Sequence, residues 1–140
     1  MLAGVLAVAG AAAVALRVAV AGHLAALYDP RSWKRNALLQ PAARACYRRL
    51  VGQGWLDTLR ARHGGERVYT FWDYFRDHWP RNAGLRIDHL LLNATLAPAL
   101  VDAGVHTWVR DRPHASDHAP TWITIDQRPP APAVKRARSR

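Results

Sequence analysis

The sequence has little cysteine and little negative charge. Its 140 residues include one cysteine, Cys46, which excludes an internal disulfide and any metal cluster built from several cysteines. Cys46 lies in a helical pattern, so we expect a packed thiol rather than a nucleophile, and a reducing, cytoplasmic setting. Asp and Glu number 10 against 20 Lys and Arg, which gives a formal net charge of +10. This imbalance favours a polyanionic partner such as nucleic acid, or less specifically an anionic membrane surface.

No apolar run is long enough to span a bilayer by itself. Residues 1–27 are almost wholly Ala, Val, Leu and Gly, but Arg17 interrupts them after 16 residues, short of the ~20 that a membrane helix needs. No basic stretch precedes the apolar residues, as it would in a secretory signal peptide. Three interpretations stay open: a membrane helix from which Arg17 snorkels, an Ala-rich buried helix, or residues outside the ancestral fold. We do not expect a membrane partner.

Composition divides the rest of the chain in two. Residues 28–126 have the mixed composition of a globular domain, whereas residues 127–140 are Pro-rich, then basic, and are predicted to be disordered. Pro41 in a first turn and Gly52 or Gly54 as a terminator predict a helix over 40–54. A short helix is predicted over 93–104, and strands over 55–60, 68–75, 85–92, 105–110 and 121–126. This alternation indicates an α/β or α+β fold.

Asp88 and the pair Asp117–His118 are candidates for chemistry. Asp88 lies in an apolar predicted strand, where a carboxylate is costly without a cation or a donor beside it. Asp117 and His118 lie in a loop directly before a strand, a place where reactive groups are commonly held. Asp88 could accept from one ring nitrogen of His118 and fix its tautomer. Alternatively, the loop motif only caps a turn, and Asp88 pairs with Arg86.

Aromatic and basic side chains alternate through residues 69–88. Arg and Asn side chains can hold phosphates, while aromatic edges enter a groove or stack on a base. Phe71 and Trp72 are therefore candidate nucleic-acid contacts. The other interpretation is that they belong partly to the core, since an alternating strand buries one face.

Four stretches carry a resemblance to a known family: RVYTFWDYF (67–75), RNAGLRIDHLLLN (81–93), LVDAGV (100–105) and SDHAPTWI (116–123). Together they resemble the C-terminal half of the exodeoxyribonuclease III family. Its members are Mg²⁺-dependent DNA repair nucleases, including apurinic/apyrimidinic (AP) endonucleases, within the endonuclease/exonuclease/phosphatase superfamily. The resemblance covers residues 28–126 and implies part of a two-sheet β-sandwich flanked by helices, in which each half of the family fold supplies one sheet.

The resemblance also implies roles for individual residues. His118 would contact the scissile phosphate or help to activate the attacking water, Asp88 would orient it, and Asp117 would lie at a Mg²⁺ or Mn²⁺ site. Positions that line the family's pocket for a flipped-out abasic sugar correspond to Phe71, Leu85 and Ile87. Positions on its DNA-facing loop correspond to Asn82 and Arg86. The implied partner is double-stranded DNA, with an abasic site as one candidate feature.

The sequence departs from the family pattern before residue 28. The metal-ligand Asn and Glu of the family's first half and its active-site Tyr have no counterpart, and Gly22–His23 stand where a Gly-Asp-x-Asn motif is expected. Because metal-assisted hydrolysis needs a cation clamped by several oxygens, we expect a truncated relative that is weak or inactive unless a separately encoded N-terminal half completes it. Half a sandwich also exposes an apolar sheet face, which residues 1–27 could partly cover. The alternatives to a nuclease are a non-catalytic DNA-binding remnant and a small membrane-attached protein.

Overall fold

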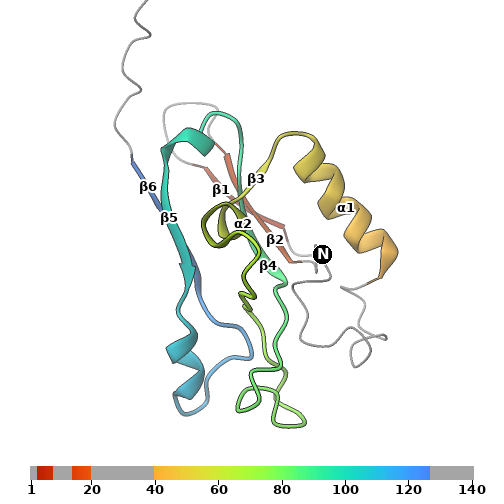
Figure 1. The fold of residues 1–140 in the computed structure, drawn as a ribbon, viewed down its shortest axis with the longest axis vertical. Coiled ribbons are helices and arrows are strands. Elements are labelled where there is room, and N and C mark those ends of the chain that lie inside the picture. Colours follow the sequence, from red (N-terminus) through yellow and green to blue (C-terminus); the bar gives the residue numbers. More distant parts are fainter. Residues whose placement is uncertain (1–2, 8–13, 20–39, 127–140) are drawn as a thin grey trace, which may run out of the picture.

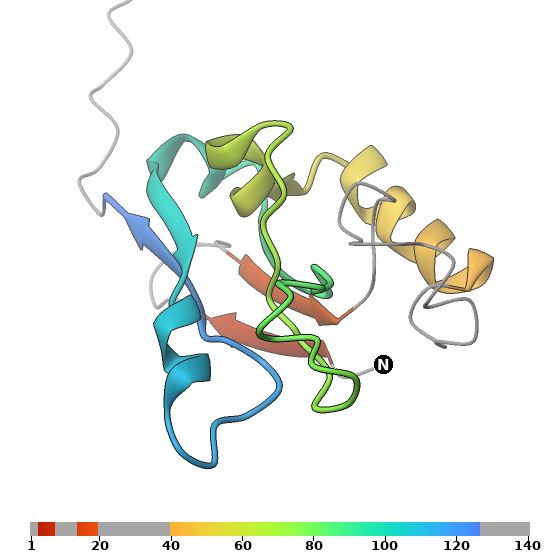
Figure 2. The same ribbon diagram turned by 60° about the horizontal axis from the view of Figure 1, so that its bottom comes forward.

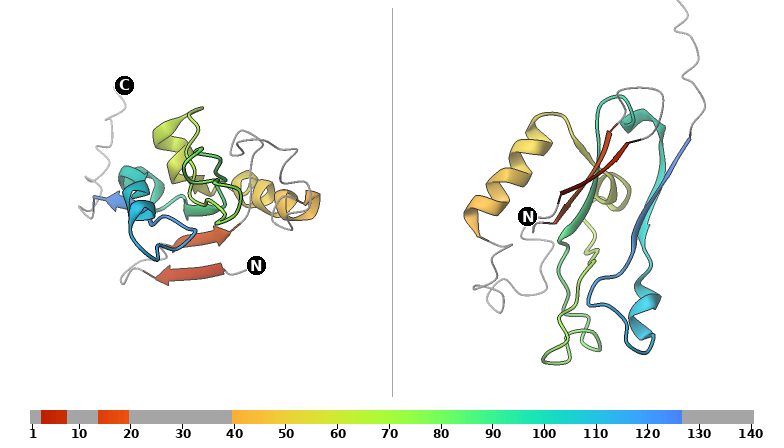
Figure 3. Two further views of the ribbon diagram at one scale, coloured as in Figure 1. Left: turned by 90° about the horizontal axis from the view of Figure 1, so that it is seen from below. Right: turned by 180° about the vertical axis from the view of Figure 1, so that it is seen from behind.

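Strands from distant parts of the chain form a four-stranded antiparallel sheet. The computed structural model describes residues 3–7, 14–19 and 40–126. The sheet has the order β1-β2-β4-β3, and its strands are β1 (Ala3–Ala7), β2 (Val14–Ala19), β3 (Leu56–Asp57) and β4 (Asp88–Leu92). Every neighbouring pair is antiparallel, and β4 is paired on both sides. β1 lies at the outer edge of this sheet (Figure 3).

A second sheet contains β5 (Leu100–Val105) and β6 (Thr121–Ile125), which pair antiparallel with an irregularity between Leu100 and Asp102. Figures 1 and 2 show it beside the four-stranded sheet. Gly104 allows the Trp122 ring to pack directly on the β5 backbone, because a Cβ there would lie 2.6 Å from the ring. The absence of a side chain at this position is therefore a packing requirement.

The helices cover both faces of β4. α1 (Pro41–Gly52) has Pro in its first turn, and α2 (Thr58–His63) begins at Asp57, whose carboxylate accepts from the Arg60 amide at 3.1 Å. Two short 3-10 helices follow, η3 (Ala97–Ala99) and η4 (Thr107–Asp111). None of the helices within residues 3–7, 14–19 and 40–126 has the length and apolar character needed to cross a membrane.

The core lies on the two sides of β4. Leu91 packs with Tyr47 of α1, whereas Leu92 packs with Leu59 of α2 and with β5. Successive side chains of a strand point to opposite faces, so one strand contributes to both clusters. Leu91 and Leu92 are fully buried, and each such burial stabilises the fold by about 1.5–3 kcal/mol.

Several predicted elements are confirmed. The helix over 40–54 is α1, the strand over 121–126 is β6, and the strand over 85–92 contains β4, with Leu85 in an isolated bridge beside it. The mixed helix and strand class is confirmed as well. Boundaries at residues 27 and 28, and the tail 127–140, lie outside the described residues.

Other predicted elements are confirmed only in part or are wrong. Residues 55–60 form a strand only at Leu56–Asp57 before α2 begins, and residues 68–75 contain only an isolated bridge at Phe71. Residues 93–104 are not one helix: the Asn93 side chain accepts from the Leu96 amide at 3.1 Å in a turn, then η3 and β5 follow. After Val105 the chain turns into η4, so 105–110 is not a strand.

The described parts of residues 1–27 are strands. β1 and β2 replace the predicted buried or membrane helix in those ranges, and the rest of the segment lies outside the described residues. Runs of Ala, Val and Leu fit a strand as well as a helix by periodicity alone, which explains why the two helical interpretations are wrong in these ranges. The third interpretation, residues outside the ancestral fold, stays open. β2 pairs along β4, so the described part of this segment adds two strands to the sheet. The partial covering of an apolar sheet face by residues 1–27 stays a prediction.

Candidate active site

The structure brings Asp88 and His118 together across the two sheets. Asp88 is the first residue of β4, and His118 lies in the loop before β6. His118 Nδ1 is 2.6 Å from Asp88 Oδ2, which is the hydrogen bond expected from the sequence. The Asp88 side chain is 3% exposed and that of His118 is 36% exposed. A buried carboxylate thus orients an imidazole that solvent can reach.

This pairing fixes what the imidazole can do. When Nδ1–H donates to Asp88, Nε2 is the basic nitrogen of the neutral ring. The carboxylate also stabilises the imidazolium after Nε2 takes a proton. His118 can therefore accept a proton from water or, once protonated, donate a hydrogen bond to an anionic oxygen.

Phe71 packs against the imidazole and completes its orientation. The two ring centroids are 5.0 Å apart with an interplanar angle of 65°, an edge contact. The backbone of Phe71 bridges Leu85 on one side and His118 on the other. Asp117 is held in the same bridge, because its carbonyl accepts from the Trp72 amide at 2.8 Å.

Asp117 provides one carboxylate beside His118. It is partly exposed, and the Ser116 hydroxyl approaches its Oδ1 at 3.4 Å. The residues of ranges 3–7, 14–19 and 40–126 contain no group of three or more His, Cys, Asp or Glu side chains arranged to hold a metal ion. Mg²⁺ is usually held by one or two carboxylates and keeps several waters, so Asp117 offers one ligand of the kind that it takes.

The predicted DNA contacts divide into exposed and buried residues. Asn82 is exposed, has a left-handed φ of 48°, and accepts from the Trp72 indole at 3.1 Å through its Oδ1. The other predicted contacts apart from Phe71 are buried: Trp72, Leu85, Arg86 and Ile87 are 0–2% exposed. Burial contradicts the predicted DNA-facing position of Arg86 and favours the core interpretation of Trp72. The lining of a sugar pocket by Leu85 and Ile87 stays a prediction.

Arg86 is the clearest correction. Its Nη1 donates to both carboxylate oxygens of Asp57, at 3.0 and 2.7 Å. The partner of this guanidinium is thus Asp57 and not Asp88, which the alternative interpretation had paired with Arg86. Arg86 thus has a structural role at the junction of β3, α2 and β4.

Asp57 is the centre of a buried cluster that the sequence did not reveal. Besides Arg86, the Tyr47 hydroxyl donates to it, and His89 Nδ1 lies 3.1 Å from Oδ2. Burial alone raises the pKa of Asp57, but the hydrogen bond with His89 and the charge of Arg86 outweigh it and hold the pKa well below its usual range. Burial, and then the Asp57 carboxylate, raise the pKa of Tyr47 above its usual value of 10.0. The same argument that singled out Asp88, a carboxylate among apolar residues, applies to Asp57 between Leu56 and Leu59.

Arg110 is a second residue that the sequence did not single out. It is 8% exposed and donates to the carbonyls of Trp72, at 3.1 Å, and of Ser116. Its guanidinium lies over the rings of Tyr74 and Trp79, with distances of 5.5 and 5.7 Å to the centroids. Arg110 thereby ties the loop over 73–82 to the loop that carries Asp117.

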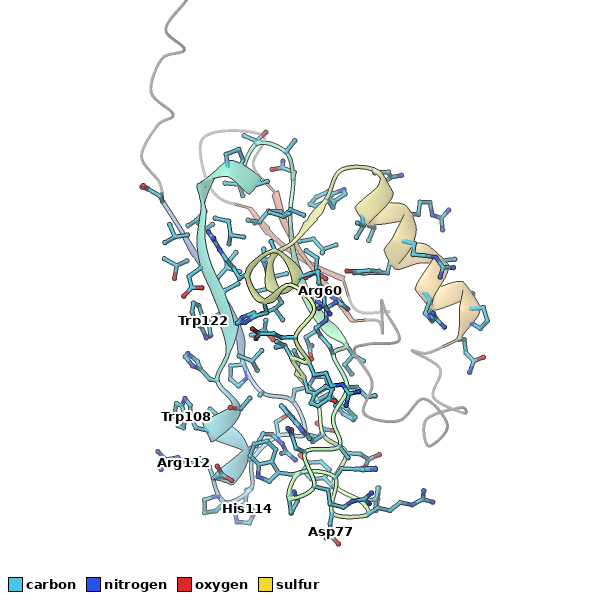
Figure 4. The ribbon with its side chains drawn as sticks, in the orientation of Figure 1. Arg60, Asp77, Trp108, Arg112, His114 and Trp122 are labelled. Carbon is cyan, nitrogen blue, oxygen red and sulfur yellow. The ribbon has the colours of Figure 1, made fainter. Side chains whose placement is uncertain are left out.

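The two loops form one end of the molecule. Figure 4 shows Asp77 of the first loop and His114 of the second at this end. Tyr74 and Phe75 are 63% and 74% exposed there, and Arg76 and Arg81 are exposed as well. Exposed aromatic and basic side chains therefore lie on the loop that is joined to the Asp117–His118 loop.

No family model matches the chain. Among curated proteins, it is 37% identical over 83 residues to exodeoxyribonuclease III of Haemophilus influenzae, which covers 59% of this chain and 31% of that protein. It is 30% identical over 100 residues to DNA repair nuclease APEX1 of Danio rerio, covering 71% of this chain and 31% of that protein. The chain thus spans about a third of the length of these relatives.

Solved structures of exonucleases and AP endonucleases are also similar to this chain. The 3′-5′ exonuclease NExo from Neisseria meningitidis superimposes with a TM-score of 0.71 at 34% identity, over 76% of this chain and 42% of that one. An AP endonuclease from Archaeoglobus fulgidus gives 0.70 at 31% identity, with the same coverage. A structure of NExo as a 3′ phosphatase is bound to a product DNA hairpin. The fold class and the sequence resemblance are thereby confirmed: this chain matches a partial region of the exodeoxyribonuclease III and AP endonuclease family.

Proposed function

We propose that this chain supplies the histidine part of a DNA repair nuclease active site that hydrolyses a phosphodiester bond. The observation that carries the proposal is the Asp88–His118 pair, with its Nδ1 to Oδ2 distance of 2.6 Å, in a chain whose relatives are named as DNA repair nucleases. A buried carboxylate that orients an exposed imidazole is an arrangement suited to proton transfer or to stabilising charge on phosphate.

In the proposed reaction, a water oxygen forms a bond to phosphorus and the phosphorus–oxygen bond to the leaving sugar breaks. Neutral His118 would take up the proton of the water at Nε2, or its imidazolium would donate to a phosphate oxygen. Asp88 would hold the ring in either case, and the edge contact with Phe71 would limit its rotation. Exonuclease and abasic-site cleavage both use this chemistry.

We infer a divalent cation, Mg²⁺ or Mn²⁺, as the cofactor. When bound, it would polarise the phosphate and lower the pKa of an attacking water. Asp117 would contribute one oxygen ligand, directly or through water. The remaining ligands would come from outside the described residues, either from elsewhere in a longer chain or from a separately encoded N-terminal half.

Double-stranded DNA is the proposed partner, with an abasic site as one candidate substrate. The exposed aromatic and basic residues of the loop over 73–82 support this, because they lie beside the Asp117–His118 loop. Asn82 would contact the backbone from the same loop. A cytoplasmic location and a domain over residues 28–126 remain part of the same proposal.

The test is cleavage of a duplex with one abasic site, with Mg²⁺ and with chelator. Because the described residues offer the cation one carboxylate, we expect the chain alone to nick DNA weakly and only with metal. This nicking should fall by about 10²–10⁴-fold in His118→Ala. His114→Ala is the matched control, because His114 is an exposed histidine of the same loop. Equal loss in both variants, or nicking that chelator does not change, would overturn the proposal.

A second candidate function is DNA binding without catalysis. The exposed Arg76 and Arg81 beside Tyr74 and Phe75 favour it. It predicts a folded chain that retards DNA, without nicking, and whose affinity falls steeply with salt while chelator has no effect. Nicking that His118→Ala abolishes would exclude it.

A further inference from the structure

Thr70 lies between the two backbone segments that carry Asp88 and His118. It is fully buried, and it belongs to neither sheet. Its amide donates to the carbonyl of Leu85 at 2.8 Å, and its own carbonyl accepts from the amide of Ala119 at 2.8 Å. The Thr70 backbone is therefore attached to the segment before β4 and to the residue that directly follows His118.

The hydroxyl of Thr70 makes a further connection. Its Oγ1 accepts from the amide of Ile87 at 3.2 Å and from the amide of Asp88 at 3.0 Å. One side chain thus receives two consecutive amides at the start of β4, where the chain enters the strand. These contacts set where the Cα of Asp88 lies relative to the segment that Thr70 shares with Ala119.

We propose that Thr70 is a positioning residue for the Asp88–His118 pair. Its carbonyl binds the amide of Ala119, next to His118, and its hydroxyl binds the amide of Asp88. One residue is therefore bonded to the backbone beside both partners of the 2.6 Å contact between Nδ1 and Oδ2. The importance of this role for cleavage rests on the proposed function, whereas the role itself concerns only the geometry of the pair.

A merely structural role must be separated from positioning, and Thr58 provides the comparison. Thr58 is also fully buried, and its hydroxyl donates to the carbonyl of Leu90 on the same strand at 2.9 Å. It therefore anchors β4 two residues beyond Asp88, and no bond of its hydroxyl reaches the segment beside His118. Thr58→Val removes a buried hydroxyl from β4 while leaving the contacts of Thr70 in place.

The experiment follows the ring proton of His118 by NMR in chain labelled with ¹⁵N histidine. A proton on Nδ1 that is shared with a buried carboxylate gives a downfield signal protected from exchange with water. We expect this signal to be lost or shifted upfield in Thr70→Val, and retained in Thr58→Val and in Thr70→Ser, which keeps the hydroxyl. An unchanged signal in folded Thr70→Val, or an equal change in Thr58→Val, would overturn the proposal.

A milder variant keeps the test decisive if Thr70→Val does not fold. Thr70→Cys places a sulfur where the hydroxyl oxygen was, and sulfur is a weaker acceptor for the Ile87 and Asp88 amides. The chemical shift of the Nδ1 proton should therefore lie between that of the parent and that of a chain in which His118 and Asp88 are not bonded. A folded Thr70→Cys protein with the parent signal would contradict the role of the hydroxyl. Amide spectra of each variant establish that the fold is retained.

The ring signal does not depend on cleavage, so failure of this proposal is distinguishable from failure of the proposed function. A chain without nuclease activity whose ring signal responds to Thr70→Cys supports positioning and rejects the proposed function. In an active protein, Thr70→Cys should lower kcat while KM for the duplex changes less than twofold, and Thr70→Ser should restore kcat. A Thr70→Cys variant with a raised KM and an unchanged kcat would overturn the positioning role.

Discussion

The guanidinium of Arg86 and the carboxylate of Asp57 form a buried ion pair in which the two side chains are 1% and 4% exposed. Nη1 lies 2.7 Å from Oδ2, and the pair joins β3 and α2 to the chain entering β4. A charge removed from such a pair leaves its partner uncompensated inside the protein. The Asp57 cluster is therefore a place where single substitutions should have large effects on stability.

Arg86→Met should lower the free energy of unfolding by about 3–5 kcal/mol, because it leaves the buried Asp57 carboxylate without its guanidinium partner. Urea unfolding measures this directly. The control is Arg81→Met at an exposed position of the loop over 73–82, which should change stability by less than about 0.5 kcal/mol. If Arg86→Met keeps its stability and instead loses DNA affinity, the DNA-facing placement predicted from the sequence is right and the buried pair is wrong.

The low pKa of Asp57 predicts a loss of stability in acid. Because the pKa of Asp57 is depressed in the folded protein, the stabilisation from its carboxylate is fully present above the unfolded pKa of 3.8. It is lost as the pH falls below that value toward the folded pKa. The urea midpoint measured from pH 5 to pH 2 should therefore drop more steeply for the parent than for Asp57→Asn. Parallel curves for the two proteins would contradict the assignment.

The raised pKa of Tyr47 predicts the opposite dependence in alkali. Its neutral phenol is favoured in the folded protein, so this stabilisation is fully present below the unfolded pKa of about 10 and is lost as the pH rises above it. Tyr47→Phe should remove that part of the alkaline decline. Absorbance of phenolate gives a second measure, since the Tyr47 phenol should stay neutral above pH 10 until the chain unfolds. Complete titration of a folded chain near pH 10 would sink the prediction.

Gly84 is predicted to tolerate no side chain. A Cβ at this position would lie 2.7 Å from the Trp72 indole nitrogen and 2.7 Å from Tyr69 Cβ, both in the buried segment beside the site. Gly84→Ala should therefore cost about 1–3 kcal/mol through overpacking. Gly65→Ala is the matched control, because nothing lies within 4 Å of its Cβ position. Thermal unfolding of the two variants should differ by several degrees, and equal midpoints would show that the segment adapts.

The sequence predicted α1 because residues that start and stop helices lie at its ends. Pro41 and Gly52 bound α1, and the pairing of Asp88 with His118 followed from the cost of a buried carboxylate. Catalytic roles for that pair, and a metal role for Asp117, stay predictions. The sequence did not predict most of β5, because residues 100–104 resemble, together with the turn before them, one helical segment, and the strand was predicted to begin only at Val105.

Tertiary contacts explain the remaining differences. Arg86 lies in a basic, aromatic-rich stretch of the kind that contacts DNA, so the sequence predicted a DNA contact. It is buried instead because it pairs with Asp57, which lies almost 30 residues earlier in the chain. Residues 68–75 have the composition of a strand, but the segment bonds to Leu85 on one side and to residues 117–119 on the other for only a few residues. Neither relationship can be read from local periodicity, which reports the neighbours of a residue along the chain.

The pairing of β2 with β4 has a consequence for the order in which the chain is made. Ala19 pairs with Asp88 and Ala15 with Leu92, so the partner strand is synthesised about 70 residues after β2. At roughly 5–20 residues per second the ribosome needs several seconds for this distance, whereas a hairpin forms within about 10 µs. The β1–β2 hairpin would therefore wait with an open edge that other nascent chains can pair with. Because β4 both covers the β2 edge and carries Asp88, the step that closes this edge also places Asp88 for its later contact with His118.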